Sequence, residues 1–112
     1  MIVNWMKCEE ENWCSLLNLN LGNDHFNNLM GVYIIWSNTT IVRVGSGIIK
    51  DRIADHRNDP LITKYSELRV TWAKVNANQM EGVEKFLADQ LSPTVGERFP
   101  NRAAIEVNLP WK

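Results

Sequence analysis

The chain has 112 residues, of which 45% are hydrophobic, and its 13 acidic and 12 basic side chains give a formal net charge of −1. This size and apolar content suit one domain with a single core, and the near-zero charge excludes a global basic field for nucleic acid. No stretch approaches the roughly 20 apolar residues of a membrane span, and the polar start does not resemble a secretory leader. We therefore expect one cytoplasmic domain over residues 1–112, outside membranes.

Residues 1–28 are expected to pack on the rest of the domain as an N-terminal segment, whose helix or loop character stays open. Its two cysteines, Cys8 and Cys14, have five residues between them. This spacing matches neither a C-x2-C metal site nor a disulfide framework, so free thiols are expected. Trp5, Trp13 and Trp111 either cover the sheet or form a dimer surface, so a monomer and a homodimer both stay open.

Three runs of residues with high β-propensity predict strands over 31–36, 40–45 and 68–75. The first two are joined by Ser37-Asn38-Thr39, a short polar stretch typical of a hairpin loop. A three-residue loop pairs Trp36 with Thr40, and counting back then puts Tyr33 opposite Arg43. A phosphate site and a structural Tyr–Arg stacking pair are both compatible with that placement.

Two helices are predicted, over 48–58 and 79–91. The first is expected to stop before Pro60, because the residue preceding a proline avoids the α region. The second has Asn78 as its expected N-cap and ends before Pro93. The predicted fold class is therefore mixed α/β (α+β): a small, mainly antiparallel three-stranded sheet flanked by helices, with a core over 29–96 and a tail over 97–112.

Polar residues fall on the apolar faces of both helices. At about 100° per residue, Arg52 and His56 lie in the same arc as Ile48, Ile49 and Ile53. Because burying an unpaired charge is costly, Arg52 either reaches a nearby surface or faces an anion in a cleft. His56 is either a satisfied, half-buried imidazole or part of the same site.

The second helix carries a glutamate at the edge of its apolar arc. Glu84 lies there, next to Leu91 and Ala88, and has no structural explanation in the sequence. Glu81 has one, because it follows Asn78 by three residues and is able to reach back to the N-cap amide. Glu84 is therefore the better candidate for a ligand or a catalytic carboxylate.

Taken in order, these residues resemble the motifs of the GIY-YIG nuclease superfamily, over roughly residues 29–96. The matching positions are Gly31-Val32-Tyr33 for the first motif, Arg43-Val44-Gly45 for the second, Arg52 for the helix arginine, His56 four residues on, and Glu84 in a helix that ends at Pro93. Two positions depart from the family pattern: Arg43 replaces the tyrosine of the second motif, and Gly96 stands where an asparagine often follows the proline.

The resemblance implies a metal-dependent nuclease that hydrolyses phosphodiester bonds in DNA. It makes Glu84 the metal ligand, with Mg²⁺ as the expected ion and Mn²⁺ as an alternative, and Arg52 the group that binds the transition-state phosphate. Tyr33 or His56 is then the base, and Arg43 binds phosphate in place of the missing tyrosine.

Two other functions stay open at the level of the sequence. One is a GIY-YIG-like domain that binds nucleic acid but cuts poorly or not at all, because Arg43 has displaced a catalytic tyrosine. The other is a protein-interaction or small-anion-binding module. The net charge of −1 further suggests either weak affinity for DNA or help from a partner protein.

Overall fold

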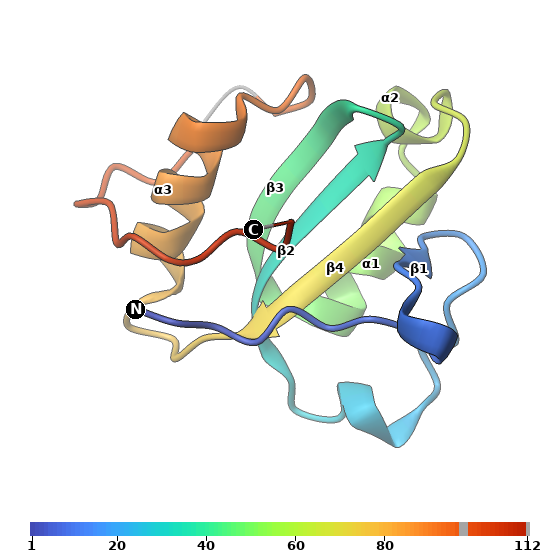
Figure 1. Cartoon of the computed structure of the whole chain (residues 1–112), viewed down its shortest axis with the longest axis horizontal. Coiled ribbons are helices and arrows are strands. Elements are labelled where there is room, and N and C mark those ends of the chain that lie inside the picture. Colours follow the sequence, from blue (N-terminus) through green and yellow to red (C-terminus); the bar gives the residue numbers. More distant parts are fainter. Residues whose placement is uncertain (97–98, 112) are drawn as a thin grey trace.

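The central element of the computed structural model, which describes residues 1–96 and 99–111, is an antiparallel sheet (Figure 1). Its strands lie in the order β1-β4-β2-β3, so that the first strand of the central hairpin is flanked by β3 and β4. The bounds are Cys14–Ser15 for β1, Met30–Ser37 for β2, Thr40–Ile48 for β3 and Leu68–Lys74 for β4. The mixed α+β class is confirmed, but the sheet has four strands rather than three. Residues 97, 98 and 112 of the predicted tail lie outside the described part.

Three α-helices accompany the sheet: α1 over Ile49–Arg57, α2 over Pro60–Thr63 and α3 over Met80–Leu91. The two predicted helices are present to within a residue at each end. The short α2 was missed because Pro60 was taken as a stop signal, whereas it occupies the first helical turn, where proline is tolerated. Asp59 caps this helix, and its side chain accepts a hydrogen bond from the Leu61 amide at 3.0 Å.

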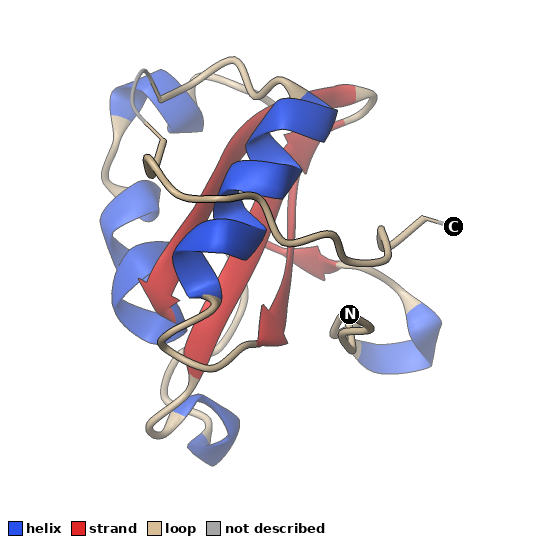
Figure 2. Cartoon of the chain, turned by 90° about the vertical axis from the view of Figure 1, so that its left-hand side faces the viewer, coloured by secondary structure: helices blue, strands red, loops and turns tan. Residues whose placement is uncertain are grey.

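The helices cover opposite faces of the sheet, with α3 on one side and α1 and α2 on the other (Figure 2). Alternation along β2 supplies both cores. Tyr33 and Ile35 pack in the cluster that contains α1, while Val32 and Ile34 pack in the cluster that contains α3. Polar groups from either face therefore come close to each other only near an edge or an end of the sheet.

The hairpin register differs from the predicted one. Tyr33 pairs with Gly45, and Arg43 pairs with Ile35. Ser37 belongs to β2 and pairs with Thr40, so the turn has two residues, and the register shifts between Ile35 and Trp36. The prediction was wrong because a β-bulge leaves one residue of β3, Val42, without a partner, and composition does not reveal a bulge.

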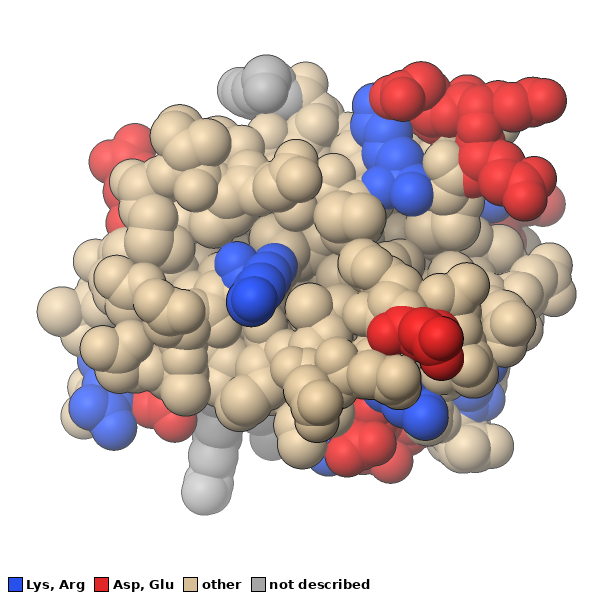
Figure 3. All heavy atoms as spheres, turned by 90° about the horizontal axis from the view of Figure 1, so that it is seen from below, with Lys and Arg blue, Asp and Glu red and all other residues tan. Residues whose placement is uncertain are grey.

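Charged side chains do not form a continuous basic surface on the face drawn in Figure 3. Basic side chains there stand apart from one another, and acidic side chains gather at one corner. Among the described residues, no helix is both long and apolar enough to cross a membrane.

The N-terminal segment lies along the outer edge of β4. Met6 donates its backbone N–H to the carbonyl of Trp72 at 3.0 Å, and β1 pairs with β4. The side chain of Arg57, at the end of α1, donates to the carbonyls of Leu16 and Leu19 in this segment. Three tryptophans pack together on the face of the sheet that α3 covers. Trp13 and Trp111 both lie edge-on against Trp36, at centroid distances of 5.6 and 5.2 Å.

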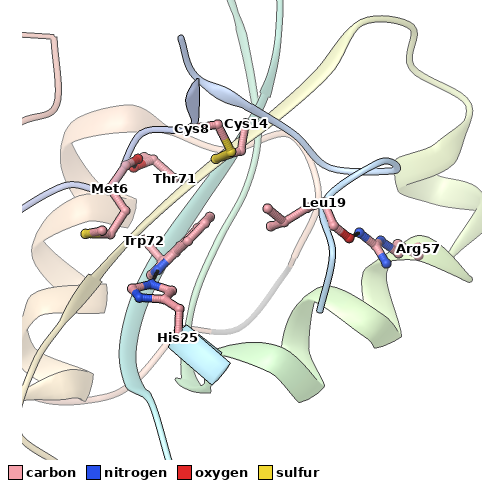
Figure 4. Close-up of a disulfide and its surroundings, with 8 residues drawn as sticks. All are labelled: Met6, Cys8, Cys14, Leu19, His25, Arg57, Thr71 and Trp72. Carbon is pink, nitrogen blue, oxygen red and sulfur yellow. Dashed lines mark hydrogen bonds between the residues drawn. A yellow bond between two sulfur atoms is a disulfide. The ribbon is translucent and has the colours of Figure 1, made fainter. Parts of the chain in front are cut away.

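Cys8 and Cys14 form a disulfide, so the prediction of free thiols is wrong (Figure 4). The short helical turn Glu9–Glu11 folds the chain back between them and brings their Cα atoms to 5.1 Å. This separation lies within the range that a disulfide needs, and the spacing rule used on the sequence takes no account of such a turn. Because disulfides persist mainly in oxidising compartments, the cysteines give no support to the cytoplasmic location expected from the sequence.

Candidate active site

Tyr33 and His56 form a buried hydrogen-bonded pair between β2 and α1. Tyr33 Oη lies 2.6 Å from His56 Nε2, and the two residues are 1% and 9% exposed. Burial is the main cause that lowers the pKa of His56 to about 4, followed by the positive charges of Arg43 and Arg52. Burial also raises the pKa of Tyr33. At neutral pH a protonated phenol and a neutral imidazole therefore share this hydrogen bond, and the tautomer of the imidazole determines which of them donates.

Gly45 makes room for this pair. It lies opposite Tyr33 in the hairpin, and a Cβ atom at Gly45 would lie 2.2 Å from Tyr33 Oη and 2.5 Å from Cζ. No real Cβ approaches other atoms so closely. The glycine of the second motif is thus required by the tyrosine of the first.

Arg43 reaches the same end of the site from the edge strand β3. Among the described residues its Nε atom has no hydrogen-bond partner, although it is buried. Burial has the largest effect on the pKa values of Tyr33, His56 and Glu84, but the charge of Arg43 is among the causes that lower all three. The guanidinium therefore lies within electrostatic range of each of these groups and has donor capacity to spare.

The segment that follows α3 holds Arg43 in place. Thr94 and Val95 donate their backbone N–H groups to the carbonyls of Ile41 and Val42, at 3.0 and 2.8 Å. Gly96 comes next with a φ of +108°, and a Cβ atom there would lie 2.2 Å from Arg43 Nη1. A glycine at this position leaves the space that the guanidinium fills.

Glu84 approaches from α3, on the other face of the sheet. It is 8% exposed, and Ser46 of β3 donates its hydroxyl to Glu84 Oε1 at 2.6 Å. Burial raises the pKa of Glu84, while the hydrogen bond from Ser46 and the charge of Arg43 oppose that rise. Sequence reasoning missed Ser46, although its place between two glycines before a helix was a usable signal.

Arg52 lies within electrostatic range of two of the other four residues, because its positive charge is among the causes that lower the pKa values of Tyr33 and His56. Its guanidinium is directed to solvent and pairs with Asp55 through an Nη2–Oδ2 contact of 2.7 Å, and both side chains are largely exposed. Its stem passes Gly47, where a Cβ atom would lie 3.5 Å from Arg52 Cγ. Both alternatives given for Arg52 stay open, because an exposed guanidinium within electrostatic range of Tyr33 and His56 suits an anion in a cleft as well as the free surface.

The cap predicted for the second helix is absent. Gln79, not Asn78, is the N-cap residue of α3, and it makes no side-chain cap hydrogen bond. Glu81 instead pairs with Arg102 of the tail, with Oε2 and Nε 2.9 Å apart. An ion pair with the distant Arg102 thus replaces the expected contact between Glu81 and the N-cap amide. The sequence near Glu81 gives no sign of this ion pair.

The donor atoms present fit a metal only with help from substrate. No group of three or more His, Cys, Asp or Glu side chains suited to a metal occurs within residues 1–96 and 99–111. Glu84 is the single carboxylate of the cluster. Mg²⁺ is commonly bound by one or two carboxylates together with substrate phosphates and water, so Glu84 suits that kind of site.

The comparisons with known proteins gave no match: no family model, curated protein or solved structure resembles this chain closely enough to be reported.

Proposed function

We propose that the chain is a phosphodiester hydrolase of the GIY-YIG type that acts on DNA. The observation that supports this proposal is the convergence of Tyr33, Arg43, His56 and Glu84, which come from β2, β3, α1 and α3. A guanidinium, a neutral imidazole and a carboxylate gathered at one end of a sheet are the groups that phosphate binding and proton transfer require. The DNA partner and the metal are part of this proposal.

Arg43 is the proposed phosphate-binding group. Its planar guanidinium suits two non-bridging oxygens of one phosphate, and such charge-assisted bonds strengthen as negative charge develops. Glu84 holds the divalent cation, which when bound polarises the phosphate and stabilises the leaving oxygen. Ser46 keeps the carboxylate oriented.

His56 is the proposed base. Tyr33 is 1% exposed with a raised pKa, which disfavours direct proton removal from water by the phenolate. The imidazole is neutral, and in the tautomer whose Nε2–H donates to Tyr33 Oη its Nδ1 is free to accept a proton. Its pKa of about 4 makes it a weak base in the free protein, and the arrival of a negatively charged phosphate raises that pKa.

Cleavage of nicked, branched and single-stranded DNA with Mg²⁺ or Mn²⁺ tests this proposal. Glu84→Gln and Arg43→Gln are each expected to lower kcat about 100-fold or more, the size seen when one electrostatic stabiliser of a transition state is removed. Glu106→Gln is the matched control, because Glu106 is an exposed carboxylate of the tail. Equal cleavage by wild type, Glu84→Gln and Arg43→Gln would reject this assignment of the site.

A second candidate, DNA binding without cleavage, is favoured by the burial of Tyr33 beside Arg43. A protein of this kind binds DNA with a steep salt dependence but leaves it intact. The Arg43→Tyr variant separates the two functions, because it restores the tyrosine of the family motif. A gain of cleavage in Arg43→Tyr over an inactive wild type would support the binding function.

A further inference from the structure

An open recess lies beside Arg43. Its volume is about 570 Å³, within the range of pockets that hold small molecules. Its walls come from α2 and the residues around it on one side and from residues 94–96 on the other. Arg43 is the one residue that the recess shares with the candidate active site, since Tyr33, His56 and Glu84 do not line it.

The charge in this recess suits an anion. Arg43 and Lys64 line it with one carboxylate, that of Asp59. The carboxylate of Asp59 accepts from the Leu61 amide at 3.0 Å, which commits one of its oxygens to capping α2. Lys64 takes part in no ion pair within the described residues, and its Nζ lies 5.4 Å from the centre of the Tyr65 ring. Arg43 and Lys64 make no ion pair within residues 1–96 and 99–111, so two cations face one space.

The walls are held by hydrogen bonds, so the recess is formed without a ligand. Tyr65 Oη lies 3.2 Å from Thr94 Oγ1 and links its two sides. The backbone of Thr94 and Val95 is bonded to β3. Leu61, which is 59% exposed, and Val95 add apolar surface beside the two charges.

We propose that this recess binds the nucleotide next to the scissile phosphate of a DNA strand. Lys64 contacts the flanking phosphate from one side and Arg43 contacts it from the other, while Leu61 and Val95 contact the sugar and base. The volume exceeds what a bare phosphate needs and suits a whole nucleotide. The identity of the occupant rests on the proposed action on DNA, because Arg43 is common to both sites.

Binding of a fluorescently labelled single-stranded oligonucleotide, measured by anisotropy over a range of salt concentrations without divalent cations, tests this proposal. Lys64→Ala is expected to weaken binding and to lower the slope of log affinity against log salt by about 0.7, the value for one phosphate contact on a single strand. Asp59→Asn is expected to tighten binding, because asparagine keeps the helix cap but removes the opposing charge. Lys74→Ala is the control, since it removes an exposed lysine at the end of β4.

Opposite effects of Lys64→Ala and Asp59→Asn support the proposal, because damage to the fold would weaken binding in both variants. Equal effects of Lys64→Ala and Lys74→Ala would overturn it. Cleavage separates this inference from the proposed function. If the wild type cuts DNA and Lys64→Ala leaves KM unchanged, the nucleotide site in the recess is wrong but the hydrolase function stands. If Lys64→Ala weakens DNA binding but the wild type never cuts DNA, the hydrolase function is wrong but the nucleotide site stands. A raised KM with an unchanged kcat in Lys64→Ala supports both.

Discussion

The contact between Tyr33 and His56 depends on a neighbouring glycine, Gly45, whose missing side chain leaves room for the Tyr33 hydroxyl. Gly45 pairs with Tyr33 across the hairpin, and the hydroxyl occupies the place where another residue would carry its Cβ. The first motif supplies the tyrosine and the second supplies the space. Both motifs are short, and their meaning comes from the register that joins them.

Gly45→Ala is expected to destabilise the fold by about 3 kcal/mol, because backbone and a buried aromatic ring must both shift. Urea denaturation measures this loss. Gly22→Ala is the matched control, since the neighbour of its new Cβ would be the side-chain oxygen of Asn20 at 3.2 Å, in an exposed turn. Similar unfolding free energies for the two variants would contradict the close packing at Gly45.

The protonation of His56 is expected to make stability depend on pH. Its folded-state pKa is about 4, below the ordinary value of 6.5, so the unfolded chain binds the proton first as pH falls. The contribution of His56 to the free energy of unfolding is complete above pH 6.5. It is lost as the pH falls toward 4, which lowers the free energy of unfolding by at most about 3 kcal/mol.

Urea denaturation of wild type and His56→Gln between pH 7 and 4 checks this dependence. Glutamine keeps an acceptor for the Tyr33 hydroxyl but does not titrate. The difference in unfolding free energy between the two proteins is expected to shrink as the pH falls. A constant difference across this range would mean that His56 does not titrate in the expected window.

At the scale of elements, the irregular parts of β3 bring the site together. The bulge at Val42 changes the alternation, so that Val42 packs with the α1 core and Val44 with the α3 core. Beyond it, the strand presents Arg43 and Ser46 to groups from both sides of the sheet. Edge strands are frequent places for bulges, which redirect side chains there.

Ser46→Ala is expected to weaken the connection between β3 and α3. It removes the hydrogen bond to Glu84 Oε1, and a bond of this kind to an ionised carboxylate contributes about 2 kcal/mol. Unfolding free energies measured at pH 8 test this value. Ser66→Ala, at an exposed site, is expected to cost less than about 0.5 kcal/mol, and a loss as large as that of Ser46→Ala would refute the special role of Ser46.

The sequence predicted long elements better than their connections. The hairpin, α1 and α3 each follow a strong apolar pattern, and such patterns report burial directly. Three features were not predicted because they do not follow from the apolar pattern of neighbouring residues. They are the bulge in β3, the capped helix α2 and the ion pair between Glu81 and Arg102.

The five site residues were chosen from polar groups on apolar faces, from the hairpin and from the family resemblance. Four of them are linked by the Tyr33–His56 hydrogen bond and by the effect of Arg43 on the other pKa values. The charge of Arg52 also acts on Tyr33 and His56, while its side chain pairs with Asp55 at the surface.

At the scale of the whole molecule, the disulfide and the candidate site lie at opposite edges of the sheet. Cys14 is in β1 at one edge, and Arg43 is in β3 at the other. The ring closed by Cys8 and Cys14 is small, with a sequence separation of 6. Its effect on the unfolded chain is correspondingly modest, about 2 kcal/mol.

Reduction of the disulfide is therefore expected to lower the unfolding free energy by about 2 kcal/mol without changing the DNA cleavage that we propose for the folded protein. Denaturation and cleavage assays with and without dithiothreitol measure both effects. The Cys8→Ser/Cys14→Ser double variant is the control, because the reductant should not change it. Loss of cleavage on reduction, with the fold intact, would show that the two edges are coupled.

The disulfide also determines which backbone groups of β4 remain available to another molecule. The outer edge of β4 is covered by Met6 and by the stretch from β1 to Leu16, which form backbone hydrogen bonds with it. The Cys8–Cys14 disulfide links these two covering segments to each other. We expect that opening the bond loosens this cover and exposes an edge strand on which a second copy is able to add its own. Oxidation would then serve as protection against fibril-like association, visible as thioflavin-positive material that forms only in the reduced protein.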